Sequence, residues 1–324
     1  MTPAMPMQPL PRDPRQLIFP GTAARMGRST SLSPANSRLA HLCYGRIRLD
    51  ARQSQVSFET GARETALLCM KLGRQYVPAA GELPTATCTV RVDGQAHELR
   101  LHDGIYIPRD SRVEITVQVA EDGGELDLVE CAAEVEGHYP LQLVRYAETA
   151  QDPSLKFRAG GAATTRDLNI VIGKNVEAGR ILAGFTRSQP GNWTSWPPHE
   201  HTTLLEEVYV YYDMPPPGFG IQMVYTEPGN PEFVGVVRDG DAVIMPSGYH
   251  PNVAAPGHSI NFVWMMAAHQ ERTDRQFGVV NVQPEFAQAG SGLEASRAGA
   301  STSPVPATAA STPGGAGQPP GHTR

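Results

Sequence analysis

The 324-residue sequence lacks several features that would place a chain in a class at once. Its four cysteines show neither paired CxxC spacing nor disulfide density, so we expect reduced thiols. No stretch approaches the roughly 18 apolar residues of a membrane span, and no apolar secretory signal is seen, which favours the cytoplasm. With a net charge of −6 and no cluster of Lys and Arg, the chain has no basis for binding nucleic acid or a membrane surface. A small-molecule partner is expected.

The two ends of the chain lack the apolar residues that a packed core needs. Residues 1–38 are rich in Pro, Arg, Ser and Ala without periodicity, and predict a disordered N-terminal extension. Residues 288–324 form a low-complexity run that predicts a disordered tail. We therefore expect the folded part of the protein to lie between them.

Helical periodicity is scarce in that central part. Short apolar or alternating runs recur about every ten residues, separated by Gly, Pro and Asp, which is typical of β-sandwiches and barrels. "ATCTVRVDG" and "RVEITVQVA" are examples in residues 39–150, and "GFGIQMVYTE" and "SINFVWMMAA" in residues 151–287. The pattern predicts an all-β protein with one unit in each range.

One pair of segments indicates that the second unit repeats the first. "LHDGIYIPRDSRVEI" and "RDGDAVIMPSGYHPNVA" share an Asp/Gly turn, an apolar strand, a Pro and a polar turn. Only the second copy has a histidine after that turn. We expect two similar barrels, of which only the second binds metal; one larger continuous β-sandwich is the alternative.

The densest chemistry lies in "GNWTSWPPHEHTTLLEEVYVYY". His199 and His201 are two residues apart, so in an extended chain they point to the same face. A glutamate follows on the next strand, and His250 follows a later one. Three imidazoles and one carboxylate are an ordinary ligand set for Zn, Mn, Fe or Ni. The sequence predicts one divalent metal ion.

Strand parity bears on which glutamate is the ligand, because Glu206 and Glu207 must point to opposite faces. If Glu207 points inward, so do Tyr209 and Tyr211, which makes a polar, aromatic-lined pocket. If Glu206 points inward, valines line the pocket instead. We prefer Glu207 because a polar pocket suits a polar ligand better.

Other residues near these motifs are weaker candidates. Gln222 and Tyr249 lie close to the predicted site along the chain, and either could be structural. Arg158 or Arg166 could hold a carboxylate in a bidentate contact. No Ser or Cys nucleophile motif with a matching base is present. The remaining histidines are expected to have no role in the site.

The metal motif resembles that of the cupins, in which His-x-His, Glu and a distant His lie in a barrel. More narrowly, "GNWTSWPPHEH", "LEEVYVYY", "GDAVIMPSGYHPNVAAPG" and "FVWMMAA", preceded by "TGARETALLCMKLG", resemble the 5-deoxy-glucuronate isomerase family of myo-inositol catabolism over roughly residues 40–285. The sister family, 4-deoxy-L-threo-5-hexosulose-uronate ketol-isomerase of pectin breakdown, is similar through "EVYVYYDMP" and "FVWMMA", and its Glu-Val-Tyr alignment supports Glu207. The short "TTLL" loop is closer to the pectin enzyme.

The resemblance implies a bicupin, two double-stranded β-helix (jelly-roll) barrels. It implies a metal-dependent intramolecular oxidoreductase that converts 5-deoxy-glucuronate to 2-deoxy-5-keto-gluconate, with zinc as the expected ion and Mn or Fe as alternatives. The ketol-isomerase of pectin breakdown, a cupin dioxygenase and a non-catalytic sugar-binding bicupin are the other candidates. The expected partners are a deoxy-uronate and, because bicupins often pair through their sheets, further copies of the chain.

Such an isomerisation passes through an enediolate, whose negative charge a metal ion stabilises. A second group must move the proton between adjacent carbons. The residues that carry these roles are predicted as follows: metal ligands His199, His201, Glu207 and His250; proton shuttle from among Glu200, Glu206, Tyr211 and Tyr249; substrate contacts from Arg166, Lys174 and Gln222.

Overall fold

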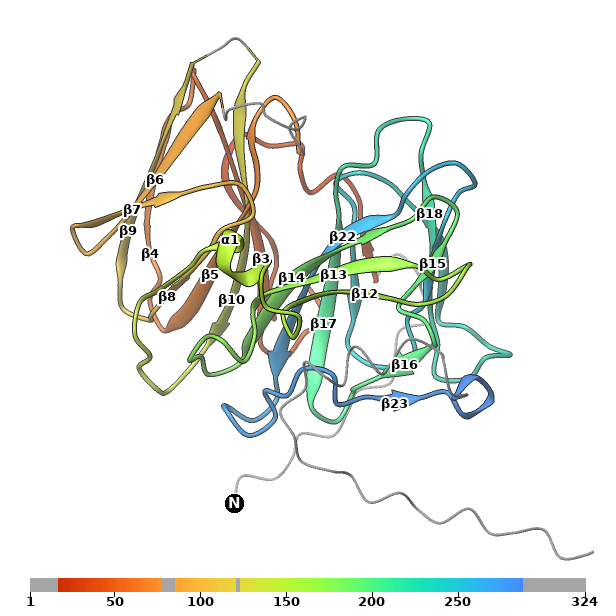
Figure 1. Cartoon of the computed structure of the whole chain (residues 1–324). Coiled ribbons are helices and arrows are strands. Elements are labelled where there is room, and N and C mark those ends of the chain that lie inside the picture. The colour runs from red at the N-terminus through yellow and green to blue at the C-terminus, as the bar shows by residue number, and fades with distance from the viewer. Residues whose placement is uncertain (1–16, 77–84, 121–122, 288–324) are drawn as a thin grey trace, which may run out of the picture.

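The computed structural model describes residues 17–76, 85–120 and 123–287. Almost all of its regular structure is β-strand. The helical elements of the described residues are one turn of α-helix, α1 (Tyr146–Thr149), and one 3-10 turn, η2 (Pro284–Phe286). Figure 1 shows two β units side by side, the earlier strands on the left and the later ones on the right. The predicted all-β class is confirmed.

The first unit packs a large sheet on a small one. The large sheet has the order β11-β8-β5-β10-β3-β2 and the small one β4-β9-β6-β7. Apolar side chains from both sheets, such as Leu67, Leu128 and Ile115, fill the space between them. The strands are β2 (Gly27–Leu32), β3 (Leu42–Asp50), β4 (Gln55–Glu59), β5 (Arg63–Gly73), β6 (Ala86–Val92), β7 (Gln95–Leu99), β8 (Gly104–Ile107), β9 (Arg112–Val119), β10 (Glu125–Glu134) and β11 (Gln142–Val144).

The second unit has the same design. Its large sheet has the order β1-β20-β17-β22-β14-β13-β12, its small sheet β15-β21-β18-β19, and β16 pairs with β23. The strands are β1 (Ile18–Phe19), β12 (Lys156–Ala159), β13 (Arg166–Ile172), β14 (Ile181–Ser188), β15 (Trp193–Thr194), β16 (His199–Glu200), β17 (Leu205–Tyr211), β18 (Gly220–Val224), β19 (Phe233–Val237), β20 (Ala242–Met245), β21 (Asn252–Ala254), β22 (Asn261–Ala268) and β23 (Asn281–Val282).

The two strand orders correspond element by element, with β12 as an additional edge strand in the second unit, which confirms the predicted duplication. β8, β5, β10, β3 and β2 of the first large sheet correspond to β20, β17, β22, β14 and β13 of the second. In the small sheets β4, β9, β6 and β7 correspond to β15, β21, β18 and β19. The two segments matched in the sequence contain β8 and β20, which occupy the same place in their units.

Sequence pattern follows burial in both units. In β9, buried and solvent-facing residues alternate, because one face meets the core and the other meets water. β22 is buried throughout and apolar after Asn261, because one face lines the barrel and the other meets the first unit. A continuous apolar run marks the strands between the units.

Residues 17–38 correct a prediction. They were expected to be disordered, yet β1 pairs with β20 of the second unit and β2 with β3 of the first. Leu17 and Leu32 are fully buried. Residues 17–38, which we call the arm, need few apolar residues of their own, because they add to sheets formed by the rest of the chain. The backbone groups and cores of those sheets order the arm. Residues 1–16 and the predicted tail 288–324 lie outside the described residues.

The two large sheets meet in one apolar layer. Tyr44, Met70 and Val129 of the first unit belong to the same buried cluster as Phe185 and Val208 of the second. A buried carboxylate crosses the interface as well. Glu64 of β5 accepts backbone N–H groups of residues 179–181 at 2.6 to 2.9 Å. The units are therefore fixed to one another by packing and by directional bonds.

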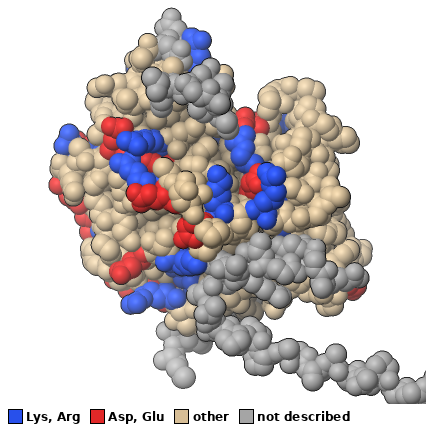
Figure 2. All heavy atoms as spheres, viewed as in Figure 1, with Lys and Arg blue, Asp and Glu red and all other residues tan. Residues whose placement is uncertain are grey.

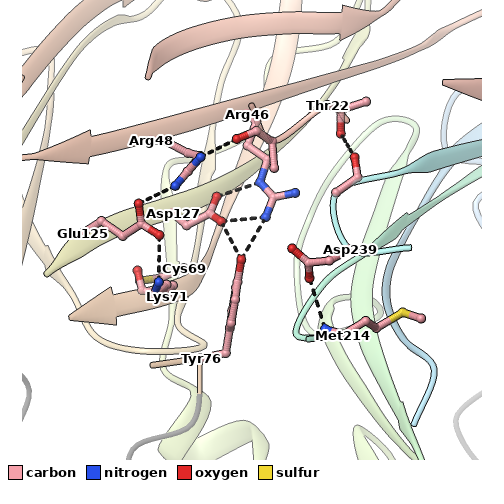
Figure 3. A network of polar contacts seen from close by, with 12 residues as sticks. Thr22, Arg46, Arg48, Cys69, Lys71, Tyr76, Glu125, Asp127, Met214 and Asp239 are labelled. Carbon is pink, nitrogen blue, oxygen red and sulfur yellow. Dashed lines mark hydrogen bonds and ion pairs between the residues drawn. The ribbon is translucent and has the colours of Figure 1, made fainter. Parts of the chain in front are cut away.

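Figure 3 shows a polar network at the edge of this layer. Arg46 donates two hydrogen bonds, 2.7 and 2.6 Å long, to the Asp127 carboxylate, and both side chains are 1% exposed. The Tyr76 hydroxyl donates to Asp127 at 3.3 Å. Such a buried pair contributes more to a defined arrangement of strands than to net stability.

The surface carries no single dominant charge on the face that Figure 2 shows, where Lys and Arg lie among Asp and Glu. All four cysteines are buried, free thiols. Within the described ranges, no helix is long and apolar enough to cross a membrane.

Candidate metal centre

Three histidines and a glutamate come together in the second unit. His199 lies in β16, His201 two residues later, Glu207 in β17 and His250 after β20. The ligand atoms of His201, Glu207 and His250 lie within 4.8 Å of one another, and none of these residues is more than 5% exposed. The His199 ring centroid is 5.0 Å from that of His250 and 6.5 Å from that of His201. The structure gathers three predicted ligands tightly and places the fourth beside them.

Backbone carbonyls hold the rings of all three histidines. Each Nδ1 atom lies 2.9 to 3.1 Å from a carbonyl oxygen, to which it donates. That contact fixes the orientation of each ring and leaves Nε2 as the atom that can bind a ligand, as in metal-binding histidines generally. The pairs are His199 with Pro197, His201 with Leu205 and His250 with Gly248.

The Nε2 atoms meet the glutamate. His201 Nε2 lies 3.0 Å from Glu207 Oε2. His250 Nε2 lies 3.1 Å from the same oxygen but outside hydrogen-bond geometry, so this buried nitrogen has no hydrogen-bond partner among the described residues. A buried polar atom is costly when it is unsatisfied. A divalent cation bound by these atoms would satisfy it, so the residues present fit a metal ion.

The protonation states of Glu207 and His199 suit a metal site, whereas contact with Glu207 raises the pKa of His201 against the effect of its burial. Burial alone would raise the pKa of Glu207, but contacts with His201 and His250 lower it to about 2, so the carboxylate is charged. Burial and the neighbouring His250 lower the pKa of His199 to about 3, so its imidazole is neutral. A charged carboxylate and a neutral imidazole are the forms that bind a cation.

Glu206 points away from this cluster. Its carboxylate accepts the backbone N–H groups of Ala40, His41 and Leu42 at 2.6 to 2.7 Å. The prediction that Glu206 serves as a catalytic group is therefore wrong, because its oxygens bind the first unit on the other side of the sheet. The parity argument placed the two glutamates on opposite faces, as the structure does.

A cavity in the second barrel opens beside the cluster. His199, His201 and Glu207 lie on its wall, together with Arg166, Tyr209 and Ser195. Leu168, Phe262, Trp264 and Phe277 make an apolar side. The cavity is thus mostly apolar, with few polar groups at defined places, as small-molecule sites usually are.

Arg166 is a buried cation without a counter-charge. It is 4% exposed, and its guanidinium donates to the carbonyl oxygens of Thr164 at 3.0 Å and Trp196 at 2.7 Å. No carboxylate of the described chain pairs with it, and burial lowers its pKa to about 10. A buried guanidinium is stabilised by an anion in bidentate contact, so this predicted substrate contact stands in a suitable place.

Two predicted residues instead support the cluster from outside the cavity. The Gln222 amide donates to the backbone oxygens of Met223 and His250 at 2.7 and 2.9 Å. The Tyr211 hydroxyl donates to Gln222 Oε1 at 2.5 Å, and Asn252 donates to the same oxygen. Gln222 is therefore not a substrate contact and Tyr211 is not a proton shuttle, because the polar atoms of both side chains are hydrogen-bonded within the protein.

The remaining candidates lie elsewhere. Lys174 is exposed and absent from the cavity wall. Tyr249 packs on Tyr225 with ring centroids 5.5 Å apart, away from that wall. The Glu200 carboxylate accepts from the Thr202 N–H and from Asn281. None of these three has the position that was predicted for it.

Tyr209 and Ser195 carry hydroxyl groups on the cavity wall and were not selected from the sequence as site residues. Their hydroxyls lie 2.7 Å apart on the cavity wall. The Tyr209 ring stacks on Phe262 at 4.1 Å and meets the His250 ring edge-on at 5.7 Å. The alternation along β17 predicted that Tyr209 points inward, whereas nothing in the sequence indicated a role for Ser195.

A C-terminal strap closes part of the cavity. Residues 277–280 lie on its wall, and β23 then pairs with β16, which carries His199. Gln283 fixes the end of the strap, since its N–H donates to Pro198 and its Oε1 accepts from Tyr225. Residues more than 70 positions apart along the chain thus frame one site.

Comparisons with known proteins give one family match and several relatives. Residues 17–283 match the model of the KduI/IolB family. The chain is 33% identical over 170 residues to the 5-deoxy-glucuronate isomerase of Geobacillus thermodenitrificans (strain NG80-2), which covers 50% of this chain and 58% of the relative. It is 31% identical over 173 residues to that of Bacillus velezensis (strain DSM 23117 / BGSC 10A6 / LMG 26770 / FZB42), covering 51% and 60%. The matches span less than two thirds of either relative.

Solved structures confirm the bicupin fold. An IolB-like protein from Salmonella typhimurium LT2 superposes with a TM-score of 0.68 at 20% identity, covering 84% of this chain and 98% of that one. A variant of Bacillus subtilis oxalate decarboxylase gives a TM-score of 0.51 at 13% identity, covering 77% and 76%. At such identities the likeness concerns the fold alone.

Proposed function

Since the chain belongs to the KduI/IolB family, we propose that it is a metal-dependent aldose–ketose isomerase that converts 5-deoxy-glucuronate into 2-deoxy-5-keto-gluconate. One observation carries the proposal. The imidazole–carboxylate cluster and the unpaired guanidinium of Arg166 share one cavity. Such a cavity has one place for a carbonyl and another for a carboxylate, which are the two ends of an open-chain uronate.

His201, Glu207 and His250, with His199 beside them, would hold the divalent ion, for which we keep zinc as the expected metal and Mn or Fe as alternatives. When bound, the ion supplies a Lewis acid that polarises the carbonyl and lowers the energy of the enediolate. The backbone carbonyl groups that accept from each Nδ1 restrict rotation of the imidazoles, so less rotational freedom is lost when the ion binds.

Arg166 orients the substrate by binding its carboxylate. Its neighbour on the same face of β13 is Leu168, which also lines the cavity. The carbon next to the carboxylate therefore meets an apolar side chain. A methylene group suits that place, and 5-deoxy-glucuronate has one there, whereas the pectin-derived substrate has a keto group.

Tyr209 and Ser195 supply the hydroxyl groups that the reaction needs close to the cluster. Because the two hydroxyls bond to one another, one O–H is left to donate to a substrate oxygen. Phe262 and Trp264 keep water from that wall, which strengthens such a contact. These two residues replace the shuttle candidates named from the sequence.

The test is a side-by-side assay of metal-loaded protein with 5-deoxy-glucuronate and 4-deoxy-L-threo-5-hexosulose-uronate. We expect faster isomerisation of the first. Faster turnover of the second would assign the protein to the pectin reaction, in keeping with its short "TTLL" loop. Oxygen consumption coupled to turnover would indicate a dioxygenase. Binding of both uronates without turnover would indicate a sugar-binding protein.

A further inference from the structure

The outer face of the small sheet in the second unit is apolar across all four of its strands. Cross-strand pairing aligns Trp193 with Val253, Val253 with Ile221, and Ile221 with Val236 in one row. Met223 and Val234 pair in the next row of the same face. Val234 is 53% and Val236 39% exposed. These six side chains form what we call the outer apolar face.

The first unit provides an internal comparison, because its small sheet has the same strand order. There the outward residues of the paired strands β9 and β4 are polar, for example Thr116 opposite Gln55 and Glu114 opposite Ser57. The outward residues of β6 are Thr87, Thr89 and Arg91. A small sheet of this fold that faces water therefore carries polar residues. The outer apolar face departs from that pattern, as expected of a surface that is covered in the working protein.

The charges at the ends of β19 indicate what covers it. Glu232 precedes the strand and Arg238 follows it, so continued alternation places both on the side of Val234 and Val236. The Glu232 carboxylate also accepts from the Thr226 N–H and hydroxyl. The outward series is thus acidic, apolar, apolar, basic, with its centre at Gly235. When the series is read in the reverse direction, the apolar positions coincide and the acidic and basic positions exchange places. A surface with that property is complementary to itself.

We propose that two copies of this chain pack face to face through the outer apolar face, with their β19 strands antiparallel. In that arrangement Glu232 of each copy lies near Arg238 of the other, whereas parallel strands would bring like charges together. Packing of two sheets by their apolar faces is the ordinary way to bury such surfaces. Each cavity stays within its own copy, so the proposal is independent of the proposed isomerase activity.

Residues 288–324 of the same chain would be a poorer cover. Residues 288–324 contain only two large aliphatic side chains, Leu293 and Val305, and are otherwise mostly Ala, Ser, Gly, Pro and Thr. Such a composition has too little apolar surface to match six large side chains. A second copy brings an apolar face of equal size.

Sedimentation velocity of the full chain over a range of concentrations tests the proposal. We expect a species of twice the 34.9 kDa chain mass. Val234→Glu, at an already exposed position, is expected to raise the dissociation constant by about tenfold or more. Thr116→Glu, on the outward face of β9, is the matched control and should leave it unchanged.

The charges test the orientation. Arg238→Glu should weaken the dimer, and the double exchange Glu232→Arg with Arg238→Glu should restore it. A wild-type monomer at every concentration overturns the proposal. So does a dimer that Val234→Glu leaves intact, or a monomer that dimerises only when residues 288–324 are removed, since the tail would then be the cover.

Discussion

Glu64 and Glu206 make the same contact in opposite directions across the interface between the two units. Each is a buried glutamate on an equivalent strand, β5 or β17, and each accepts three backbone N–H groups at the start of the other unit's β14 or β3. Charge-assisted bonds of this kind are about twice as strong as neutral ones. The two units thus share a pair of reciprocal clamps, although the histidines of the candidate metal centre lie in the second unit.

Removing one of these clamps is expected to lower the free energy of unfolding. Glu206→Gln replaces one acceptor oxygen by an NH2 group that faces backbone donors, and we expect a loss of about 2 to 3 kcal/mol in the free energy of unfolding. Urea denaturation measures it, and Glu59→Gln on the exposed face of β4 is the control. Metal content per chain should stay at the wild-type value. A variant with normal stability and no metal would instead make Glu206 a ligand.

Metal binding is expected to depend on Glu207 and His250. Glu207→Gln and His250→Ala should each abolish stoichiometric metal, measured by elemental analysis after dialysis, because both remove an atom of the buried cluster. His199→Ala tests the fourth predicted ligand in the same way. If His250→Ala kept both metal and activity, the assignment of the centre would be wrong.

Gln222 is expected to act as a positioning residue for His250. Gln222→Glu keeps the oxygen that accepts from Tyr211 but removes the N–H donors to the His250 backbone, so metal affinity should fall about 10- to 100-fold. Competition with a chelator measures it. Gln118→Glu, on an exposed position of β9, is the control. Unchanged metal affinity would show that the turn needs no such support.

Arg166 is expected to decide affinity for the substrate carboxylate. Arg166→Gln should lower kcat/KM about 100-fold through KM, since a buried charge-assisted pair is lost. Arg158→Gln, whose guanidinium is exposed and paired with Asp167, is the control. Binding of the matching neutral sugar separates recognition from misfolding, because Arg166→Gln should leave it unchanged. Equal loss with both ligands would contradict a carboxylate contact.

Tyr209 is expected to affect kcat rather than metal content. Tyr209→Phe removes the hydroxyl that faces the cavity and should lower kcat about 100-fold, the usual range for one proton-transfer or oxyanion contact. Tyr249→Phe is the control, since its ring lies off the cavity wall. A Tyr209→Phe variant with wild-type kcat would exclude the residue from the reaction.

Because of His102, the free energy of unfolding is expected to fall in acid. Burial lowers its pKa from 6.5 in the unfolded chain to about 3. Only the unfolded state takes up the proton between these values, so the contribution is complete above pH 6.5 and falls as pH drops toward 3. From about pH 7.5 to pH 5 the loss is about 2 kcal/mol. His102→Asn, which tolerates the positive φ of this position, should flatten that slope.

The alternation of side chains along a strand predicted only part of the site. It placed Glu207 and Tyr209 inward and Glu206 outward, because a strand fixes the face of each side chain. It failed at Tyr211, which is on the inward face but two residues further along the barrel, past the cavity. Parity determines the face and not the depth. Nothing in the sequence reports where along a barrel its side chains leave a cavity.

Contacts between distant segments were also beyond the sequence. Lys174 looked as suitable as Arg166 for a carboxylate, but only Arg166 lies on a strand that borders the cavity. Residues 17–38 looked disordered because their own apolar content is low, whereas their order depends on strands that the rest of the chain supplies. Local composition cannot show a partner that lies far away in the sequence.

The arm that carries β1 sets an order of events during synthesis. Gly21 bonds to Asp241, 220 residues later, and β1 occupies in the second unit the edge that β11 occupies in the first. β1 therefore leaves the ribosome long before its partner strand exists, and loop closure over such a distance is slow. The first unit can form while the ribosome is still working, but the unit with the candidate metal centre gains its edge strand β1 only after β20 has emerged. An early segment of the chain thus docks among the last.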